Sequence, residues 1–240
     1  MPWRRLLRRH HRPRSTGRHG YGTYIQSMTV GTCTAVFWSL TMLGLIGIRT
    51  LFLQLGGPSW PVPLGQRDST TASLNAANSD IPTPDYNLDQ LIAAFNKHQL
   101  SPRDMTALSG AHTIGYSQCL NFRDHIYNGT NIDPVFATLR KRTCPAQAPN
   151  GDTNLAPFDV QTALVFDIAY YSNLVTKRGL LNSDQELFNG GSQDALVSQY
   201  ATNPALFATD FVAAIIKMSN LSPPPGIPTE IRRNCRVVNS

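Results

Sequence analysis

The stretch DMTALSGAHTIGYSQC, residues 104–119, sets a histidine within an apolar helical pattern. Met105, Leu108 and His112 recur at the spacing of one helical face, so we expect His112 on the buried face of a helix. Gly115 is a suitable residue to end that helix. A histidine on an apolar face is more often a satisfied core residue than a ligand. The spacing alone therefore leaves the role of His112 open.

Helical periodicity continues on both sides of this stretch. The segment 87–100 carries apolar residues on one face, and Ser101 followed by Asp104 has the capping-box pattern that begins a helix. Residues 56–71 are rich in Gly, Pro and Ser, which predicts a loop. No period-two alternation is long enough to build a sheet. The sequence therefore predicts an all-α body, with further helices around residues 122–127, 167–176, 194–202 and 205–219.

Charge is distributed unevenly along the 240 residues. The net charge is +6, but residues 1–50 hold 8 Arg and no acidic residue, and the remainder has a net charge of −2. With 41% hydrophobic residues the chain can bury one core, so we expect one domain over residues 55–240. The slightly acidic body gives no support to a nucleic-acid partner.

Two further segments precede this domain. Residues 1–27 are basic and poor in apolar side chains, which predicts a disordered arm. Residues 28–54 form an apolar segment in which positions 28–48 carry no charge. Its length and the preceding arginines favour a signal anchor or a long signal peptide, with the N-terminus cytoplasmic. A transit peptide, a buried apolar segment and a mistranslated segment are the alternatives.

Cysteine usage and glycosylation sequons favour an exported protein. The sequons begin at Asn128 and Asn220, in predicted loops. The even number of cysteines suits an oxidising compartment, although the count does not determine their pairing. No cysteine lies in a CxxC pattern, which argues against a zinc site. The four cysteines are Cys33, Cys119, Cys144 and Cys235.

Residues 104–119 closely resemble the proximal haem-ligand signature of the plant secretory (class III) peroxidases. GGPSWPVPLGQRDSTTASLNAANSDIPTPDYNL (56–88) and FDVQTALVFDIAYYSNLVTKRGLLNSDQELF (158–188) resemble the same family. The resemblance runs from about Leu55 to Asn239. It implies the all-α haem peroxidase fold, haem b and Ca²⁺ as cofactors, and oxidation of phenolic donors by hydrogen peroxide. It also implies peroxide removal in oxidative stress, a monomer, and secretion to the cell wall or the vacuole.

The resemblance assigns roles around the haem. His112 would ligate the haem iron through one ring nitrogen, and Asp184 would accept a hydrogen bond from the other. Phe158 matches the aromatic residue that packs on the proximal ring, and Gln118 matches a position near a haem propionate. Without the family, Asp184 is interpreted as a helix or turn cap, Phe158 as a core residue and Gln118 as a surface residue.

A calcium site, an entrance and a disulfide are implied in the same way. Pro82 matches a residue at the entrance for aromatic donors, and Cys119–Cys144 matches a family disulfide. Carboxylate, hydroxyl and carbonyl oxygens suit Ca²⁺, and Val165 would contribute only its carbonyl. The residues that match the proximal calcium ligands of the family are Thr113, Asp159, Thr162, Val165 and Asp167.

The sequence departs from the family in its N-terminal part. The family's distal helix carries Arg and His four residues apart, which assist peroxide cleavage. The only histidines before His98 are His10, His11 and His19, and none has an arginine four residues upstream. We therefore expect a truncated fold in which an unrelated N-terminus replaces the distal helices. Cys235 matches a cysteine whose partner lies in that region, so we expect it to be unpaired.

These departures leave three functional hypotheses. The first is a haem peroxidase whose catalytic competence in this chain is open, because the distal residues are absent. The second is a non-catalytic haem-binding relative, which residues 28–48 would anchor to a membrane facing the lumen. The third is a non-functional gene fragment.

Overall fold

The computed structural model describes residues 55–62, 65–234 and 237–240. The predictions for residues 1–27 and 28–54 lie outside these residues. The same holds for the replacement of the distal helices and for the state of Cys235. In the described part of the chain, no helix is both long enough and apolar enough to cross a membrane.

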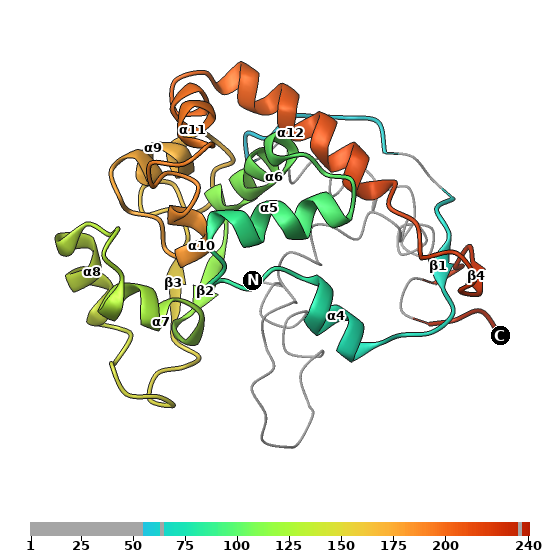
Figure 1. Ribbon diagram of the computed structural model, residues 1–240, viewed down its shortest axis with the longest axis horizontal. Coiled ribbons are helices and arrows are strands. Elements are labelled where there is room, and N and C mark those ends of the chain that lie inside the picture. Colours follow the sequence, from blue (N-terminus) through green and yellow to red (C-terminus); the bar gives the residue numbers. More distant parts are fainter. Residues whose placement is uncertain (1–54, 63–64, 235–236) are drawn as a thin grey trace.

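The described residues are mainly helical, as the sequence predicts (Figure 1). Two short antiparallel strand pairs accompany the helices: β1 (Asp68–Ser69) with β4 (Thr229–Glu230), and β2 (Tyr116–Gln118) with β3 (Leu155–Pro157). The helices are α4 (Leu74–Asp80), α5 (Leu88–Lys97), α6 (Pro102–Ser109), the 3₁₀ helix η2 (Gly110–Thr113), α7 (Cys119–Asn128), α8 (Pro134–Lys141), α9 (Ala169–Val175), α10 (Asn182–Gln185), α11 (Asp194–Tyr200) and α12 (Pro204–Ser219).

The predicted capping box begins helix α6. The backbone N–H of Asp104 donates to the Ser101 hydroxyl at 3.2 Å, and the backbone N–H of Ser101 donates to Asp104 Oδ2 at 2.9 Å. Lys217, near the end of α12, donates to the same Asp104 oxygen at 2.8 Å. The residue that caps α6 therefore also joins this helix to α12.

His112 lies outside helix α6, so the prediction of one helix through Met105, Leu108 and His112 was wrong. Helix α6 ends at Ser109, and His112 belongs to the following turn of 3₁₀ helix. Gly110 stands at the change between them and is a poor helix former. Gly115 has a φ of 102°, which glycine adopts without strain, and it turns the chain into β2.

Among the residues that the structure describes, two clusters of buried side chains make up the core. The larger joins α5, α6, α9, α11 and α12; it includes Met105, Tyr171, Phe207 and Phe211. Helix α12 packs along α6, which in turn packs on α5, and Figure 1 shows α7 and α8 at the lower left. The smaller cluster joins α7 and α8 to the segment of Phe158. Along the chain, His112 lies after α6, which belongs to the larger cluster, and before α7, which belongs to the smaller one.

Candidate functional site

The partly buried His112 and the buried Asp184 form a pair across 72 positions of sequence. The distance from His112 Nδ1 to Asp184 Oδ1 is 2.7 Å, and the two side chains are 15% and 3% exposed. An ionised carboxylate can only accept hydrogen bonds, so Nδ1–H is the donor. In the neutral ring, the proton on Nδ1 leaves Nε2 with a free lone pair.

Three donors from different segments hold the Asp184 carboxylate. Oδ1 accepts from His112 and from the hydroxyl of Tyr170 at 3.0 Å, while Oδ2 accepts from the backbone N–H of Leu181 at 3.0 Å. The last bond caps helix α10, so Asp184 caps a helix and also contacts His112. Burial, reinforced by the nearby Asp184 charge, raises the pKa of Tyr170 well above its usual value, so the phenol stays a donor.

The ring of Phe158 stacks on the ring of His112. Their centroids lie 4.1 Å apart and their planes are 1° from parallel. Tyr170 meets the same imidazole edge-on, with centroids 6.2 Å apart. The imidazole is therefore fixed on its face by Phe158 and along its edge by Asp184 and Tyr170.

These contacts fit a haem-iron ligand. Within the described residues no group bonds to His112 Nε2, and the side chain keeps some exposure while its other nitrogen is held. A ligating histidine in proteins has this arrangement, with the second nitrogen bonded to a carboxylate. Gln118, the other predicted haem neighbour, is half-buried in β2, six positions after His112.

Four of the residues predicted to bind calcium lie on the 159–167 loop, and the fifth, Thr113, contacts that loop from η2. The Thr113 hydroxyl lies 3.3 Å from the Val165 carbonyl oxygen and 3.1 Å from Asp167 Oδ1. The loop is joined to the His112 segment by a bond from Gly115 N–H to the Ala163 carbonyl at 3.1 Å. Thr113, Val165 and Asp167 therefore form one contact group.

Asp159 and Thr162 form the second contact group on this loop. Asp159 is fully buried, and its Oδ2 accepts from the Thr162 hydroxyl at 3.2 Å. Its Oδ1 accepts from Gln161 N–H, Thr162 N–H and the Asn173 amide at 2.7, 3.2 and 2.9 Å. All of these donors are neutral groups.

The donor set fits a hard cation. It consists of two carboxylates, two hydroxyls and a carbonyl, the ligand types that Ca²⁺ prefers. A divalent cation would also compensate the charge of the buried Asp159.

Helix α10, which carries Asp184, is tied to the segment before α5. The Ser183 N–H donates to the Pro84 carbonyl at 2.9 Å, and the Asn182 amide lies 3.2 Å from the Asp85 carbonyl oxygen. Pro82, the predicted donor-entrance residue, is half-buried two positions before Pro84. The predicted entrance is therefore near the helix that holds the partner of His112.

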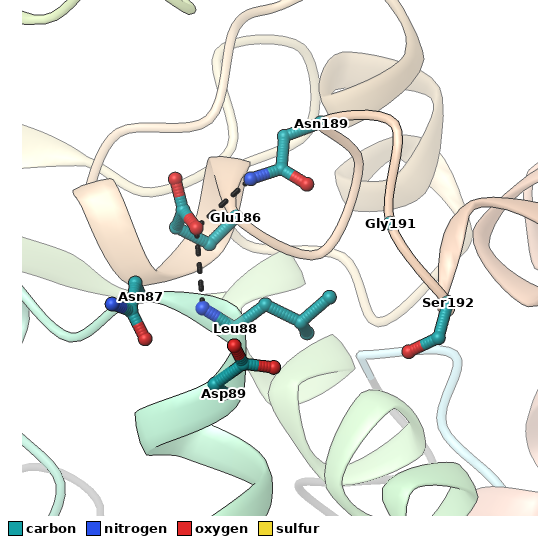
Figure 2. Close-up of a pocket in the computed structure, with 7 residues that line it drawn as sticks. All are labelled: Asn87, Leu88, Asp89, Glu186, Asn189, Gly191 and Ser192. Carbon is teal, nitrogen blue, oxygen red and sulfur yellow. Dashed lines mark hydrogen bonds between the residues drawn. The ribbon is translucent and has the colours of Figure 1, made fainter.

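A cavity of about 430 Å³ lies between the start of α5 and the segment that follows α10 (Figure 2). In its lining, Glu186 Oε2 accepts hydrogen bonds from Leu88 N–H at 3.1 Å and from the Asn189 amide at 2.9 Å. None of the predicted site residues lines this cavity. Its lining residues are Asn87, Leu88, Asp89, Glu186, Asn189, Gly191 and Ser192.

Within the described part of the chain, two of the cysteines are bonded to each other and both sequon asparagines are exposed. Cys119 and Cys144 form a disulfide, and both are fully buried. Asn128 ends helix α7 and is exposed, and Asn220 is exposed just after α12. Both asparagine side chains therefore face solvent.

The sequence did not lead us to predict two residues of the site, Tyr170 and Asn173. Tyr170 lies in an apolar run of helix α9, where a tyrosine is normally a core residue, and nothing in its spacing points to Asp184. Asn173 is fully buried in the same helix. A buried amide requires partners, so its position on the apolar side of α9 was the one usable signal.

Known sequences resemble almost the whole chain. The sequence model of the family described as "Peroxidase" matches residues 30–203, so the match begins within the apolar segment 28–54. Peroxidase 70 of Zea mays is 54% identical over 222 residues, covering 92% of this chain and 69% of the relative. Peroxidase P7 of Brassica rapa subsp. rapa is 52% identical over 215 residues, covering 90% and 72%.

A shorter match is equally similar. Peroxidase 22.3 of Oryza sativa subsp. japonica is 54% identical over 195 residues, with 81% of this chain and 62% of the relative covered. The family match extends over more than half of the chain, and these identities are far above chance. The chain therefore belongs to the peroxidase family, among the plant class III haem peroxidases.

Proposed function

We propose that this chain binds haem b through His112 Nε2 and acts in the oxidation of phenolic donors by hydrogen peroxide. The observation that carries the proposal is the His112–Asp184 pair, which holds Nδ1 and leaves Nε2 without a partner in the described part of the chain. Bound haem would supply the iron that reacts with peroxide and accepts electrons from the donor.

The protein groups would tune that iron through the imidazole. A hydrogen bond from Nδ1–H to the Asp184 carboxylate gives the ring anionic character, which makes Nε2 a stronger ligand. Stronger donation stabilises the oxidised iron and lowers its reduction potential. Phe158, stacked on the imidazole, keeps the ring from rotating out of this geometry.

Calcium is the second cofactor of the proposal. Thr113, Val165 and Asp167 would bind it with Asp159 and Thr162, through the oxygens described above. Because Thr113 directly follows His112, the cation would fix the backbone beside the iron ligand.

The cellular context is proposed from family membership, the disulfide and the sequons. We expect a glycosylated monomer secreted to the cell wall or vacuole, with Asn128 and Asn220 as glycosylation sites and phenolic donors entering near Pro82. A membrane anchor through residues 28–48, facing the lumen, is the alternative location.

A non-catalytic haem-binding role is the second candidate. One observation favours it: in the sequence before His98, no histidine has an arginine four residues upstream. General acid–base catalysis contributes roughly 10²–10⁴-fold to such reactions, so its loss would leave slow turnover. Haem binding is common to both candidates, and rapid turnover belongs only to the first.

Haemin titration followed by a peroxide assay tests the proposal. The purified full chain would be titrated with haemin while the Soret band is recorded, and then supplied with hydrogen peroxide and a phenolic donor. His112→Ala should abolish specific binding, and Asp184→Asn should weaken it. His98→Ala is the matched control, because it removes a half-buried histidine at the end of α5.

The outcomes separate the candidates. His112-dependent binding with rapid donor oxidation supports the peroxidase. His112-dependent binding with slow oxidation supports the non-catalytic role. Equal binding by His112→Ala and His98→Ala contradicts both, and absence of haem binding together with absence of a cooperative fold favours a gene fragment.

A further inference from the structure

One carboxylate oxygen beside His112 serves two side-chain donors. Asp184 Oδ1 accepts from His112 Nδ1–H at 2.7 Å and from the Tyr170 hydroxyl at 3.0 Å. Two donors on one oxygen share its negative charge, so each weakens the bond that the other can form. The strength of the His112–Asp184 bond therefore depends on whether the phenol is present.

Tyr170 is placed so that its hydroxyl remains on Asp184. The residue is only 2% exposed, and its ring packs against Tyr171 with centroids 5.1 Å apart. The same ring meets His112 edge-on. A buried hydroxyl needs a partner, and the partner that the structure gives Tyr170 is the Asp184 carboxylate.

We propose that Tyr170 is a positioning residue that limits how strongly Asp184 attracts the Nδ1 proton of His112, and thereby limits the anionic character of the imidazole. The phenol also fixes the carboxylate orientation, because the Leu181 N–H holds only the other oxygen, Oδ2, at 3.0 Å. The consequence for iron rests on the haem-binding role proposed above, whereas the effect on the Nδ1 proton does not.

Tyr170→Phe tests this idea with minimal change, since it removes the hydroxyl and keeps the packed ring. Tyr171→Phe is the matched control. That residue is the next in the same helix, is fully buried, and donates its hydroxyl to the Thr106 carbonyl at 2.8 Å, away from Asp184. Both variants lose one buried hydroxyl, so a purely structural role predicts similar spectra for the two.

The first measurement is made on the haem-free chain. Proton NMR of ¹⁵N-histidine-labelled protein follows the His112 Nδ1–H resonance, which moves downfield as its hydrogen bond strengthens. We expect a downfield shift in Tyr170→Phe and no shift in Tyr171→Phe. Thermal denaturation of the two variants, compared with each other, shows whether the packing has been preserved equally.

The second measurement is made on the haem-loaded chain. Resonance Raman of the ferrous form gives the iron–histidine stretching frequency, and spectroelectrochemistry gives the reduction potential. Tyr170→Phe should raise the frequency and lower the potential, whereas Asp184→Asn should change both in the opposite direction. Tyr171→Phe should match the unsubstituted chain.

The results distinguish this inference from the haem proposal. A chain that does not bind haem refutes the haem role, and the NMR shift still decides the role of Tyr170. A Tyr170→Phe resonance that coincides with that of the unsubstituted chain overturns the inference, even when His112 binds haem. An equal shift in Tyr171→Phe also overturns it, because general loosening of helix α9 would then explain the change.

Discussion

The hydroxyl of Thr113 donates a hydrogen bond to Asp167 Oδ1 at 3.1 Å, and the backbone N–H of Asp167 donates to Thr113 Oγ1 at 3.4 Å. Thr113 directly follows His112, so this reciprocal pair joins the 159–167 loop to the residue next to the proposed iron ligand. A cation on that loop would therefore stabilise the backbone that carries His112.

Thr113→Val should weaken calcium binding, because it replaces an oxygen ligand with a methyl group of similar size. Calcium at about 100 times its dissociation constant stabilises a folded protein by about 2.7 kcal/mol. We expect calcium to raise the melting temperature of the unsubstituted chain and to raise that of Thr113→Val much less. Isothermal titration calorimetry with calcium, paired with thermal unfolding, measures both effects.

Thr138→Val provides the control for this substitution. Its hydroxyl is exposed on α8 and donates to the Pro134 carbonyl at 2.8 Å, outside the loop. Calcium affinity that is equal in Thr113→Val and Thr138→Val would contradict the assigned ligand role.

Helices with a wide apolar stripe or a clear cap could be predicted from the sequence. In α12 the stripe places Phe207 and Phe211 in the core, at 2% exposure each, and the Ser101 cap begins α6 as predicted. Helices α4, α8 and α10 were not predicted. Helix α4 buries none of its side chains and α10 has only four residues, so neither shows an apolar stripe.

The functional geometry required more than spacing. The 3₁₀ turn at His112 differs from an α-helix only in backbone conformation, so an apolar pattern cannot distinguish the two. The contact of His112 with Asp184 spans 72 positions and was expected solely because the motifs resemble a family. The contact of Tyr170 with Asp184 could not be predicted from the sequence. A tyrosine on an apolar helix face has the same pattern whether it bonds a carboxylate or only packs in the core.

Removal of the Cys119–Cys144 disulfide should destabilise the smaller core cluster. The bridge joins the start of α7 to the chain after α8, with 25 positions between the cysteines. Closing a loop of this length reduces the entropy of the unfolded chain, which corresponds to about 3.5 kcal/mol. We expect Cys119→Ala to lower the free energy of unfolding by about that amount in urea denaturation.

A double-mutant cycle checks that the bridge is responsible. Either single substitution breaks the disulfide, so Cys119→Ala with Cys144→Ala should cost little more than one of them alone. Costs that add fully would indicate that packing of the two sulfur atoms, rather than the covalent link, accounts for the loss.

Gly110→Ala should be strongly destabilising because the core leaves no room for a side chain. An added Cβ would lie 2.5 Å from Phe207 Cε2 and 2.7 Å from Phe207 Cζ, and it would also clash with the Tyr171 hydroxyl. Overpacking of this kind costs about 1–3 kcal/mol, which urea denaturation measures directly. Phe207→Leu removes the ring atoms, so adding it to Gly110→Ala should cost less than the sum of the two single substitutions. Strict additivity would show that the ring is not the obstacle.

His125 should make the protein less stable in acid. The residue is 5% exposed, and neither ring nitrogen has a hydrogen-bond partner among the described residues. Burial lowers the pKa of His125, although the carboxylates of Asp184, Asp124 and Glu186 oppose the shift. The folded chain therefore binds this proton more weakly than the unfolded chain, whose histidine titrates at about 6.5.

The direction of the pH effect follows from this difference. Above about pH 6.5 both states are neutral at this position, and the contribution of His125 to stability is fully present. As the pH falls towards the lower folded-state pKa, the unfolded state takes up the proton first, so stability decreases.

His125→Leu removes this titration, and we expect its free energy of unfolding to fall less between about pH 7.5 and pH 5 than that of the unsubstituted chain. His98→Leu, a substitution at the half-buried end of α5, should retain the steeper fall. Urea denaturation at several pH values measures these slopes, and equal slopes for His125→Leu and the unsubstituted chain would rule out His125 as the source of acid sensitivity.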